Sequence, residues 1–220
     1  MIKLPDFGRA YEYENDFYLS CDKQRIGKLI AHYELFKMSQ NIEGEIIECG
    51  VFKGASLVRF AMFRKLFQSK YEKKIIGFDS FAEFPQTDFE ADKKLRDHIV
   101  KEAGEQSIST DQLIEVLKNK SCDDSVELIA GDITLTVPEY VKKNPDLKIS
   151  LLNLDTDIYE PSVTILENFY PKLAKGGILI LDDYNVFPGE TKAADDYFKG
   201  KNVSIKNFPF SNTPCYLIKE

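Results

Sequence analysis

The chain has 220 residues, of which 43% are hydrophobic and 30% are charged, a composition typical of a globular protein with a sizeable core. Its formal net charge of −7 and its scattered Lys and Arg residues argue against a broad nucleic-acid-binding face. No apolar run reaches the roughly 18 residues needed to span a bilayer, and the first residues lack the apolar stretch of a signal peptide. We therefore expect one cytoplasmic domain over residues 1–220, with neither nucleic acid nor membrane among its partners.

The first part of the chain, about residues 1–40, is expected to be an N-terminal extension. Residues 1–20 are rich in aromatic and acidic side chains and follow no clean period. Residues 23–39 place apolar side chains near helical spacing, which predicts an amphipathic helix.

From residue 45 onward, short apolar runs alternate with helical patterns. The expected strands are residues 45–49, 74–78, 126–130, 149–154, 177–181, 203–205 and 215–218. The expected helices between them are residues 55–67, 135–143, 161–173 and 191–198. Such alternation implies parallel β-α-β units, while the short link before the last strand makes the last pair antiparallel. The sequence therefore predicts a doubly wound α/β fold with a mostly parallel seven-stranded sheet and an antiparallel last strand.

One segment interrupts this alternation between the second and third expected strands. Residues 81–124 contain two amphipathic stretches with charged surfaces, at about 90–103 and 110–119. A long excursion at this point in a compact domain is usually functional, so we expect a lid or an interface.

Acidic residues stand at or near the end of every one of the first five expected strands. They are Glu48, Asp79, Asp132, Asp155 and Asp182. In an open parallel sheet, ligands bind outside the carboxyl ends of the strands. The set of acids on one rim therefore predicts a ligand site there.

A glycine loop joins the first strand to its helix. Gly50 and Gly54 flank Phe52 and Lys53, so the middle glycine that allows a backbone to approach a pyrophosphate is missing. This argues against NAD and against a P-loop, and fits a nucleoside without a diphosphate. Asp79 follows the next strand, where it can accept hydrogen bonds from ribose hydroxyls. The alternative is a tight turn that binds nothing.

A second acidic group is formed by Asp155 and the pair Asp182-Asp183. If their strands are neighbours, their ends lie about 5 Å apart, and the carboxylates would repel unless a cation were present. Oxygen ligands favour Mg²⁺ or another hard divalent cation. Such a cation could lower the pKa of a substrate hydroxyl, and Asp157 could accept the proton as general base. The alternative is helix capping or a solvated turn.

The histidines and cysteines are not expected to carry the chemistry. His32 is expected to be structural and His98 to lie on the surface. Cys21, Cys49, Cys122 and Cys215 form no CxxC pair and are expected to be free thiols.

The sequence around these sites resembles the macrocin O-methyltransferase family, and more distantly catechol O-methyltransferase. The matching stretches, within about residues 44–200, are 48–56, 77–81, 154–161 and 181–184. The resemblance implies a Rossmann-like class I methyltransferase fold, S-adenosylmethionine and Mg²⁺ as cofactors, and a sugar hydroxyl as the methyl acceptor.

The resemblance also assigns roles to individual residues. The methionine part of the cofactor would contact Glu48, Gly50 and Ser56, with Phe52 in the same loop; the ribose would contact Asp79 and Ser80, and the adenine Asp132 and Ile133; Asp155 would also border the cofactor. The metal ligands would be Asp155, Asp182 and Asp183, and the base would be Asp157. Asp132 stands where many members have an aromatic residue, and the chain is short for the family.

The leading hypothesis is a metal-dependent O-methyltransferase acting on a sugar, a nucleotide-sugar or another sugar-bearing small molecule. We also expect a homo-oligomer. Fold alone does not exclude a metal-assisted hydrolase or a nucleotide-dependent oxidoreductase on the same scaffold. A third hypothesis is a non-catalytic binding subunit that uses the aromatic N-terminus and residues 81–124 as interfaces.

Overall fold

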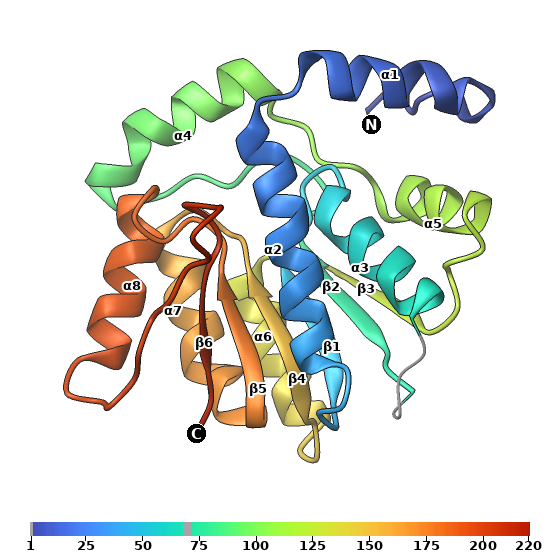
Figure 1. Ribbon diagram of the computed structural model, residues 1–220. Helices are drawn as coiled ribbons and strands as arrows, with labels where there is room; N and C mark the ends of the chain where they lie inside the picture. The colour runs from blue at the N-terminus through green and yellow to red at the C-terminus, as the bar shows by residue number, and fades with distance from the viewer. Residues whose placement is uncertain (1, 68–71) are drawn as a thin grey trace.

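The computed structural model describes residues 2–67 and 72–220 and is built around one six-stranded sheet (Figure 1). The strands lie in the order β3-β2-β1-β4-β5-β6, and all neighbours are parallel except β5 and β6. Their bounds are Glu45–Cys49 (β1), Ile75–Asp79 (β2), Val126–Ala130 (β3), Ile149–Leu154 (β4), Leu173–Leu181 (β5) and Cys215–Ile218 (β6). The α/β class and the antiparallel last strand are therefore confirmed.

Helices cover both faces of this sheet (Figure 1). One face packs against α2 (Lys23–Ser39), α3 (Ala55–Leu66) and α5 (Thr110–Asn119), and the other against α6 (Ile133–Lys143), α7 (Tyr159–Asn168) and α8 (Pro188–Phe198). Strands β2 and β4 are buried along their whole length. Their continuous apolar runs follow from this burial on both faces.

The prediction of a seventh strand at residues 203–205 is wrong. In this segment a single antiparallel bridge joins Lys206 to Tyr216, with Lys206 and Tyr216 exchanging backbone hydrogen bonds of 2.8 and 2.7 Å. Before it, the amide of Val203 donates to Lys201 O at 3.0 Å, a local turn contact instead of an extended ladder. The stacking of Phe208 on Tyr216 then holds the loop against β6 without strand pairing.

The N-terminal part divides into two helices with different environments. Helix α2 buries Ala31, Leu35 and Phe36 and belongs to the core. Helix α1 (Ala10–Ser20) buries no residue and lies across the end of the molecule at which the parallel strands finish (Figure 1). Among the described residues, no helix is long and apolar enough to cross a membrane.

The excursion at residues 81–124 supplies α4 (Glu90–Ala103) and α5. Helix α5 begins with a capping box formed by Ser109 and Gln112, and it packs Leu113 and Leu117 into the core. Helix α4 lies above the carboxyl ends of the strands, near α8 (Figure 1).

A close backbone approach joins the ends of the two central strands. Gly50 has a φ of +91°, and a Cβ atom there would lie 1.7 Å from the carbonyl oxygen of Asp155. The neighbouring amide of Asp155 donates to Cys49 O at 2.9 Å. The glycine is thus required so that the loop after β1 can lie against the acidic loop after β4.

We expect Gly50→Ala to lower the free energy of unfolding by about 3 kcal/mol or more, because it combines positive φ with a backbone clash. Gly200→Ala is the matched control, since Gly200 has a φ of +74° but no atom within 4 Å of the added Cβ. The control should cost only about 1 kcal/mol. Urea unfolding of both variants measures the difference, and equal losses would contradict the steric account.

Candidate active site

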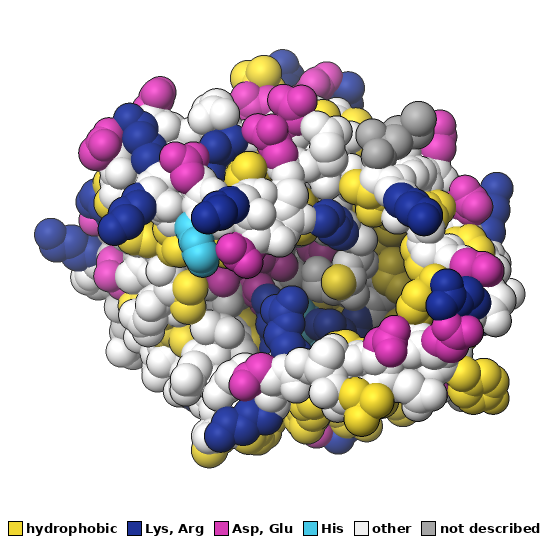
Figure 2. All heavy atoms as spheres, turned by 90° about the horizontal axis from the view of Figure 1, so that it is seen from above, with side chains coloured by type: hydrophobic (Ala, Val, Ile, Leu, Met, Phe, Trp, Pro, Cys, Tyr) yellow, Lys and Arg dark blue, Asp and Glu magenta, His cyan; other side chains and the backbone are white. Residues whose placement is uncertain are grey.

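Two adjoining cavities open at the carboxyl ends of the parallel strands, where Figure 2 shows a hollow in the surface. The larger has a volume of about 620 Å³ and the smaller about 320 Å³. Gly50, Phe52, Asp155 and Asp157 line both. The larger cavity is also lined by four other residues that the sequence assigned to a cofactor: Asp79, Ser80, Asp132 and Ile133.

Asp79 organises the glycine loop. Its Oδ2 accepts hydrogen bonds from the amides of Val51 and Phe52 at 2.8 and 2.9 Å, and its Oδ1 accepts from the amide of Phe81 at 2.7 Å. The hydroxyl of Ser80 also donates to Oδ1 at 3.3 Å. A ribose hydroxyl that binds Asp79 must therefore share these oxygens or replace the long contact from Ser80.

Glu48 and Ser56 form a buried pair beneath this loop. The Ser56 hydroxyl donates to Glu48 Oε1 at 2.9 Å, and Asn153 donates to Oε2 at 3.5 Å. Burial raises the pKa of Glu48 to about 8. Ser56 lines the smaller cavity, whereas Glu48 is wholly buried and lines neither. Sequence reasoning missed Asn153, which stands inside the apolar run of β4.

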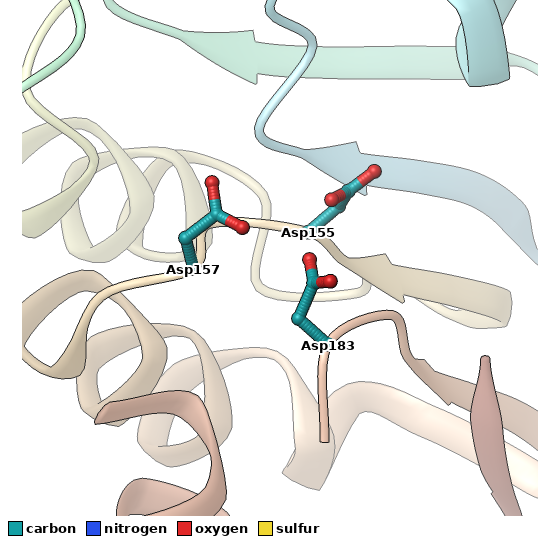
Figure 3. A group of neighbouring side chains, drawn as sticks. All are labelled: Asp155, Asp157 and Asp183. Atoms are coloured by element: carbon teal, nitrogen blue, oxygen red, sulfur yellow. The ribbon is translucent and has the colours of Figure 1, made fainter. Parts of the chain in front are cut away.

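Three carboxylates meet where β4 and β5 end. Oxygen atoms of Asp155, Asp157 and Asp183 all lie within 4.8 Å of one another. Figure 3 shows Asp155 and Asp157 coming from one loop and Asp183 from the next, with the carboxyl groups of Asp157 and Asp183 directed toward Asp155. Burial, together with Asp182 and Asp183, raises the pKa of Asp155, and burial together with Asp155 raises that of Asp157 to about 7.

Asp182 is oriented differently from the other acids of this group. Its buried carboxylate forms an ion pair with Lys28 and lies 3.2 Å from His32 Nε2. Successive residues at the end of a strand point to opposite faces, which separates Asp182 from Asp183. Burial alone would raise the pKa of Asp182, but Lys28 and His32 hold it below its ordinary value.

A hydrogen-bonded relay continues from Asp182 to α3. Arg59 Nη1 lies 2.9 Å from His32 Nδ1. Because a guanidinium can only donate, Nδ1 accepts and Nε2–H donates to Asp182. Burial lowers the pKa of His32, consistent with this neutral form. His32, which was expected to be structural, therefore lies beside the site. Lys28 and Arg59 lie there as well, and sequence reasoning missed both.

Glu190, on α8, is a further buried acid that sequence reasoning missed. Its Oε1 accepts from the amide of Asp183 at 3.0 Å, and its own amide donates to Asp157 O at 3.3 Å. Among the described residues, its Oε2 has no hydrogen-bond partner. Glu190 thus holds the backbones of two site residues in place while adding to the buried acidity.

The excursion is fastened to the site by two acids. Asp92 of α4, which is wholly buried, accepts from the amides of Tyr159 at 3.0 Å and Gly189 at 2.7 Å. These amides stand at the starts of α7 and α8, where backbone donors lack partners within the helix. Glu160 in turn accepts from the amides of Asp88 and Phe89 at 2.9 and 3.1 Å. Residues 84–88 are thereby held as a wall of the larger cavity.

The family pattern described as Macrocin-O-methyltransferase (TylF) matches residues 18–213, which include every residue of the larger cavity and all those of the smaller one except Phe17. The chain belongs to this family. The match also covers the excursion, so α4 and α5 lie within the region that the macrocin O-methyltransferase family shares.

The chain is also similar in sequence to two O-methyltransferases. Demethyldecarbamoylnovobiocin O-methyltransferase of Streptomyces niveus is 25% identical over 164 residues, 73% of this chain and 60% of the relative. Mycinamicin III 3''-O-methyltransferase of Micromonospora griseorubida is 27% identical over 174 residues, 76% of this chain and 65% of the relative. The chain therefore spans less than two thirds of the length of these relatives.

Solved structures agree with the assignment to the macrocin O-methyltransferase family. The calicheamicin methyltransferase CalS11 superposes with a TM-score of 0.78 at 28% identity, covering 95% of this chain and 85% of CalS11. An apo structure of CalS11, described as a TDP-rhamnose 3'-O-methyltransferase, gives a TM-score of 0.67 at 26% identity, covering 94% and 85%.

We expect Asp92→Ala to detach α4, because it leaves the amides of Tyr159 and Gly189 without an acceptor. The loss in free energy of unfolding should be about 2–4 kcal/mol, and hydrogen exchange should quicken in α4 and at the starts of α7 and α8. Lys93→Ala is the control, since Lys93 is exposed and, within the described part of the chain, forms its ion pair with Glu90. The fastening role is excluded if exchange in α7 and α8 is unchanged in Asp92→Ala.

Proposed function

We propose that the protein is an S-adenosylmethionine-dependent O-methyltransferase that methylates a hydroxyl of a sugar or sugar-bearing small molecule. The observation that carries this proposal is the placement of the glycine loop, Asp79 and the carboxylate group around one cavity in a chain of the macrocin O-methyltransferase family. Membership of the family and the recorded activities of CalS11 and the two antibiotic-modifying relatives support the reaction type.

The larger cavity suits the cationic, nucleoside-containing cofactor. Its charged lining is acidic throughout the described residues: Asp79, Glu83, Asp88, Asp132, Asp155, Asp157 and Glu160. A sulfonium cation is favoured in such a field. We assign the ribose to Asp79 and Ser80, the adenine to Asp132 and Ile133, and the methionine part to Gly50 and Phe52 and, in the adjoining smaller cavity, to Ser56, which Glu48 supports from below.

The carboxylate group suits one hard divalent cation. Two oxygens that each lie about 2.1–2.4 Å from one cation are at most about 4.8 Å apart, which accommodates the spacing among Asp155, Asp157 and Asp183. We propose that Asp155 and Asp183 hold Mg²⁺, which in proteins takes one or two carboxylates and keeps sites for water and substrate. Asp182 is the third metal ligand expected from the sequence, but it could bind the cation only if its ion pair with Lys28 were broken.

The charge of the site supports a cation as well. Glu48, Asp155, Asp157, Asp182, Asp183 and Glu190 are close enough to raise one another's pKa, and Lys28 and Arg59 are the cations that act on them. Carboxylates this close repel unless protons or a metal neutralise them. Raised pKa values are therefore the expected state of such a site without its cation.

The reaction can be followed through the groups of this chain. When bound, S-adenosylmethionine supplies an electrophilic methyl group, and the divalent cation lowers the pKa of the acceptor hydroxyl. Asp157 accepts the hydroxyl proton on its carboxylate. Its carboxylate lies beside those of Asp155 and Asp183, so it is next to the hydroxyl that a cation held there would activate. Residues 84–88 wall the larger cavity, and the fixed loops orient the two reactants.

Isothermal titration calorimetry with S-adenosylmethionine tests the proposed function directly. We expect one molecule to bind per chain in the presence of Mg²⁺, followed by methyl transfer to a sugar acceptor. Absence of binding by wild-type protein at millimolar cofactor would overturn the proposal.

We expect Asp157→Asn to lower the methyl-transfer rate by about 10²- to 10⁴-fold, because the amide cannot accept the proton. Asn is the suitable replacement since Asp157 has a φ of +64°, which asparagine tolerates. Affinity for S-adenosylmethionine should change by less than about 3-fold. Asp146→Asn, an exposed carboxylate at the opposite end of β4, is the control. An unreduced rate in Asp157→Asn would remove Asp157 from the mechanism.

Cation binding should also appear in the stability of the protein. Acids whose folded pKa is raised, such as Asp157 at about 7 and Glu48 at about 8, bind more protons folded than unfolded. Without metal, the melting temperature should therefore decrease as the pH is raised from about 5 to about 8. Saturating Mg²⁺ should raise it by about 5–10 °C, and by more at pH 8 than at pH 6, because the metal competes with protons.

Differential scanning calorimetry with and without Mg²⁺ measures both effects. Asp155→Asn and Asp183→Asn should each abolish most of the Mg²⁺-dependent shift, whereas Asp146→Asn should keep it. A wild-type melting temperature that is independent of Mg²⁺ at every pH would contradict a metal site here.

A further inference from the structure

Lys28 brings a positive charge to the carboxylates of the candidate metal site. It stands on α2 one helical turn before His32, so both side chains lie on one face of the helix and reach Asp182, the residue that follows β5. Lys28 forms an ion pair with Asp182 Oδ2, and His32 Nε2 lies 3.2 Å from Oδ1. Each oxygen of this wholly buried carboxylate therefore already has a partner.

The packing of α2 keeps Lys28 in this place. Gly27 is buried, and a Cβ atom there would lie 2.9 Å from Phe210 O and 3.2 Å from Ser211 Oγ. A larger side chain would force the helix or the loop at Phe210 to move. Lys28 is thus held near the end of β5 by the position of the helix backbone as well as by its ion pair.

The ammonium group acts on more than one carboxylate. Lys28 lines the smaller cavity together with Asp155 and Asp157, and Figure 2 shows basic side chains within the hollow. Burial is the main cause of the raised pKa values of Asp155, Asp157 and Asp183, and Lys28 opposes the rise at all three. The same positive charge repels a metal ion that binds these carboxylates.

Asp182 lies outside the set of oxygens that suits one cation. In the described part of the chain, that set consists of Asp155, Asp157 and Asp183 and does not include Asp182. A metal ion that recruited Asp182 would have to displace Lys28 from it, so two cations would compete for one carboxylate. The residue expected from the sequence as the third ligand is therefore engaged by a cation of the protein itself.

We propose that Lys28 is an internal counterion that excludes Asp182 from the metal site and thereby lowers the affinity of the protein for the divalent cation. The proposal rests on the proposed function. It departs from the three-aspartate set that the family resemblance implies, because it leaves Asp155 and Asp183 as the metal ligands. Mg²⁺ bound through two carboxylates keeps coordination positions for water and for substrate oxygens. Oxygens of the acceptor would then complete a coordination shell that the free protein holds only weakly.

The alternative is an ion pair with a purely structural role. Removal of such a pair changes the stability of the fold but leaves the affinity for Mg²⁺ as it was. The affinity for Mg²⁺ is therefore the measurement that separates the two explanations.

Calorimetric titration of the whole protein with Mg²⁺ alone tests the proposal without a methyl acceptor. Lys28→Met should bind Mg²⁺ at least about 10-fold more tightly than wild type, because the repulsion is lost and Asp182 is released to bind the cation. Lys28→Arg keeps the charge and the donors, so its affinity should stay within about 3-fold of wild type. Lys37→Met, which removes an exposed lysine from the same helix, is the matched control and should also stay within about 3-fold.

A double variant keeps the test decisive if Lys28→Met does not fold. Lys28→Met with Asp182→Asn removes the ion pair as a neutral unit and leaves no unpaired charge at position 182. Because Asp182 is not a ligand in the proposed site, the double variant should bind Mg²⁺ within about 3-fold of wild type. Binding that is at least about 10-fold weaker would show that Asp182 holds the metal in wild type and would overturn the proposal.

The proposal is also overturned if Lys28→Met folds and binds Mg²⁺ no more tightly than wild type, which is the result expected of a structural ion pair. Titration of wild-type protein with S-adenosylhomocysteine separates these outcomes from failure of the proposed function. If S-adenosylhomocysteine binds, the assignment of the cofactor stands whatever the Mg²⁺ titrations show. If it does not bind, the proposed function itself is rejected, and the role of Lys28 in an acceptor reaction is rejected with it.

Discussion

Mutual repulsion among buried and half-buried carboxyl groups is the constraint around which this site is built. Asp155, Asp157, Asp182, Asp183 and Glu190 are gathered where β4 and β5 end. The Lys28–Asp182 ion pair offsets part of this repulsion, and hydrogen bonds from backbone amides to the carboxyl groups offset another part. The remainder leaves carboxyl groups with raised pKa values, and a bound cation would lower those pKa values by neutralising the repulsion.

Much of the fold could be predicted from the sequence because its signals are local. The apolar runs at residues 45–49 and 149–154 have the length and composition of buried strands, and both are strands in the structure. The segment 203–205 has a similar run, but strand formation there depends on a partner, and β6 forms only an isolated bridge beside it, at Lys206, in the part of the chain that the structure describes. The sequence pattern contains no measure of that competition.

The candidate site was predictable to the extent that its residues follow strands. Asp79, Asp155 and Asp183 are found at the rim as expected. Lys28, Arg59 and Asp92 come from helices, and their partners are far away in the sequence; Lys28 and Asp182 are 154 positions apart. A charged residue on an amphipathic helix is most simply read as solvated, so only the packing of the helices reveals these contacts. The separate orientations of Asp182 and Asp183 likewise depend on which face of β5 each side chain occupies.

The hydrogen bonds of Asp92 to the first residues of α7 and α8 matter for any redesign of the molecule. One side chain from α4 caps both α7 and α8, so Asp92 ties α4 to the starts of two scaffold helices. A chimera that grafts the corresponding segment from another member would need an aspartate at this position, together with a glycine at 189, where a Cβ would lie 2.0 Å from the carboxylate. The graft would also need Glu160 and Arg96, which bind backbone groups of residues 84–88, and it could then vary the side chains that this cavity wall presents.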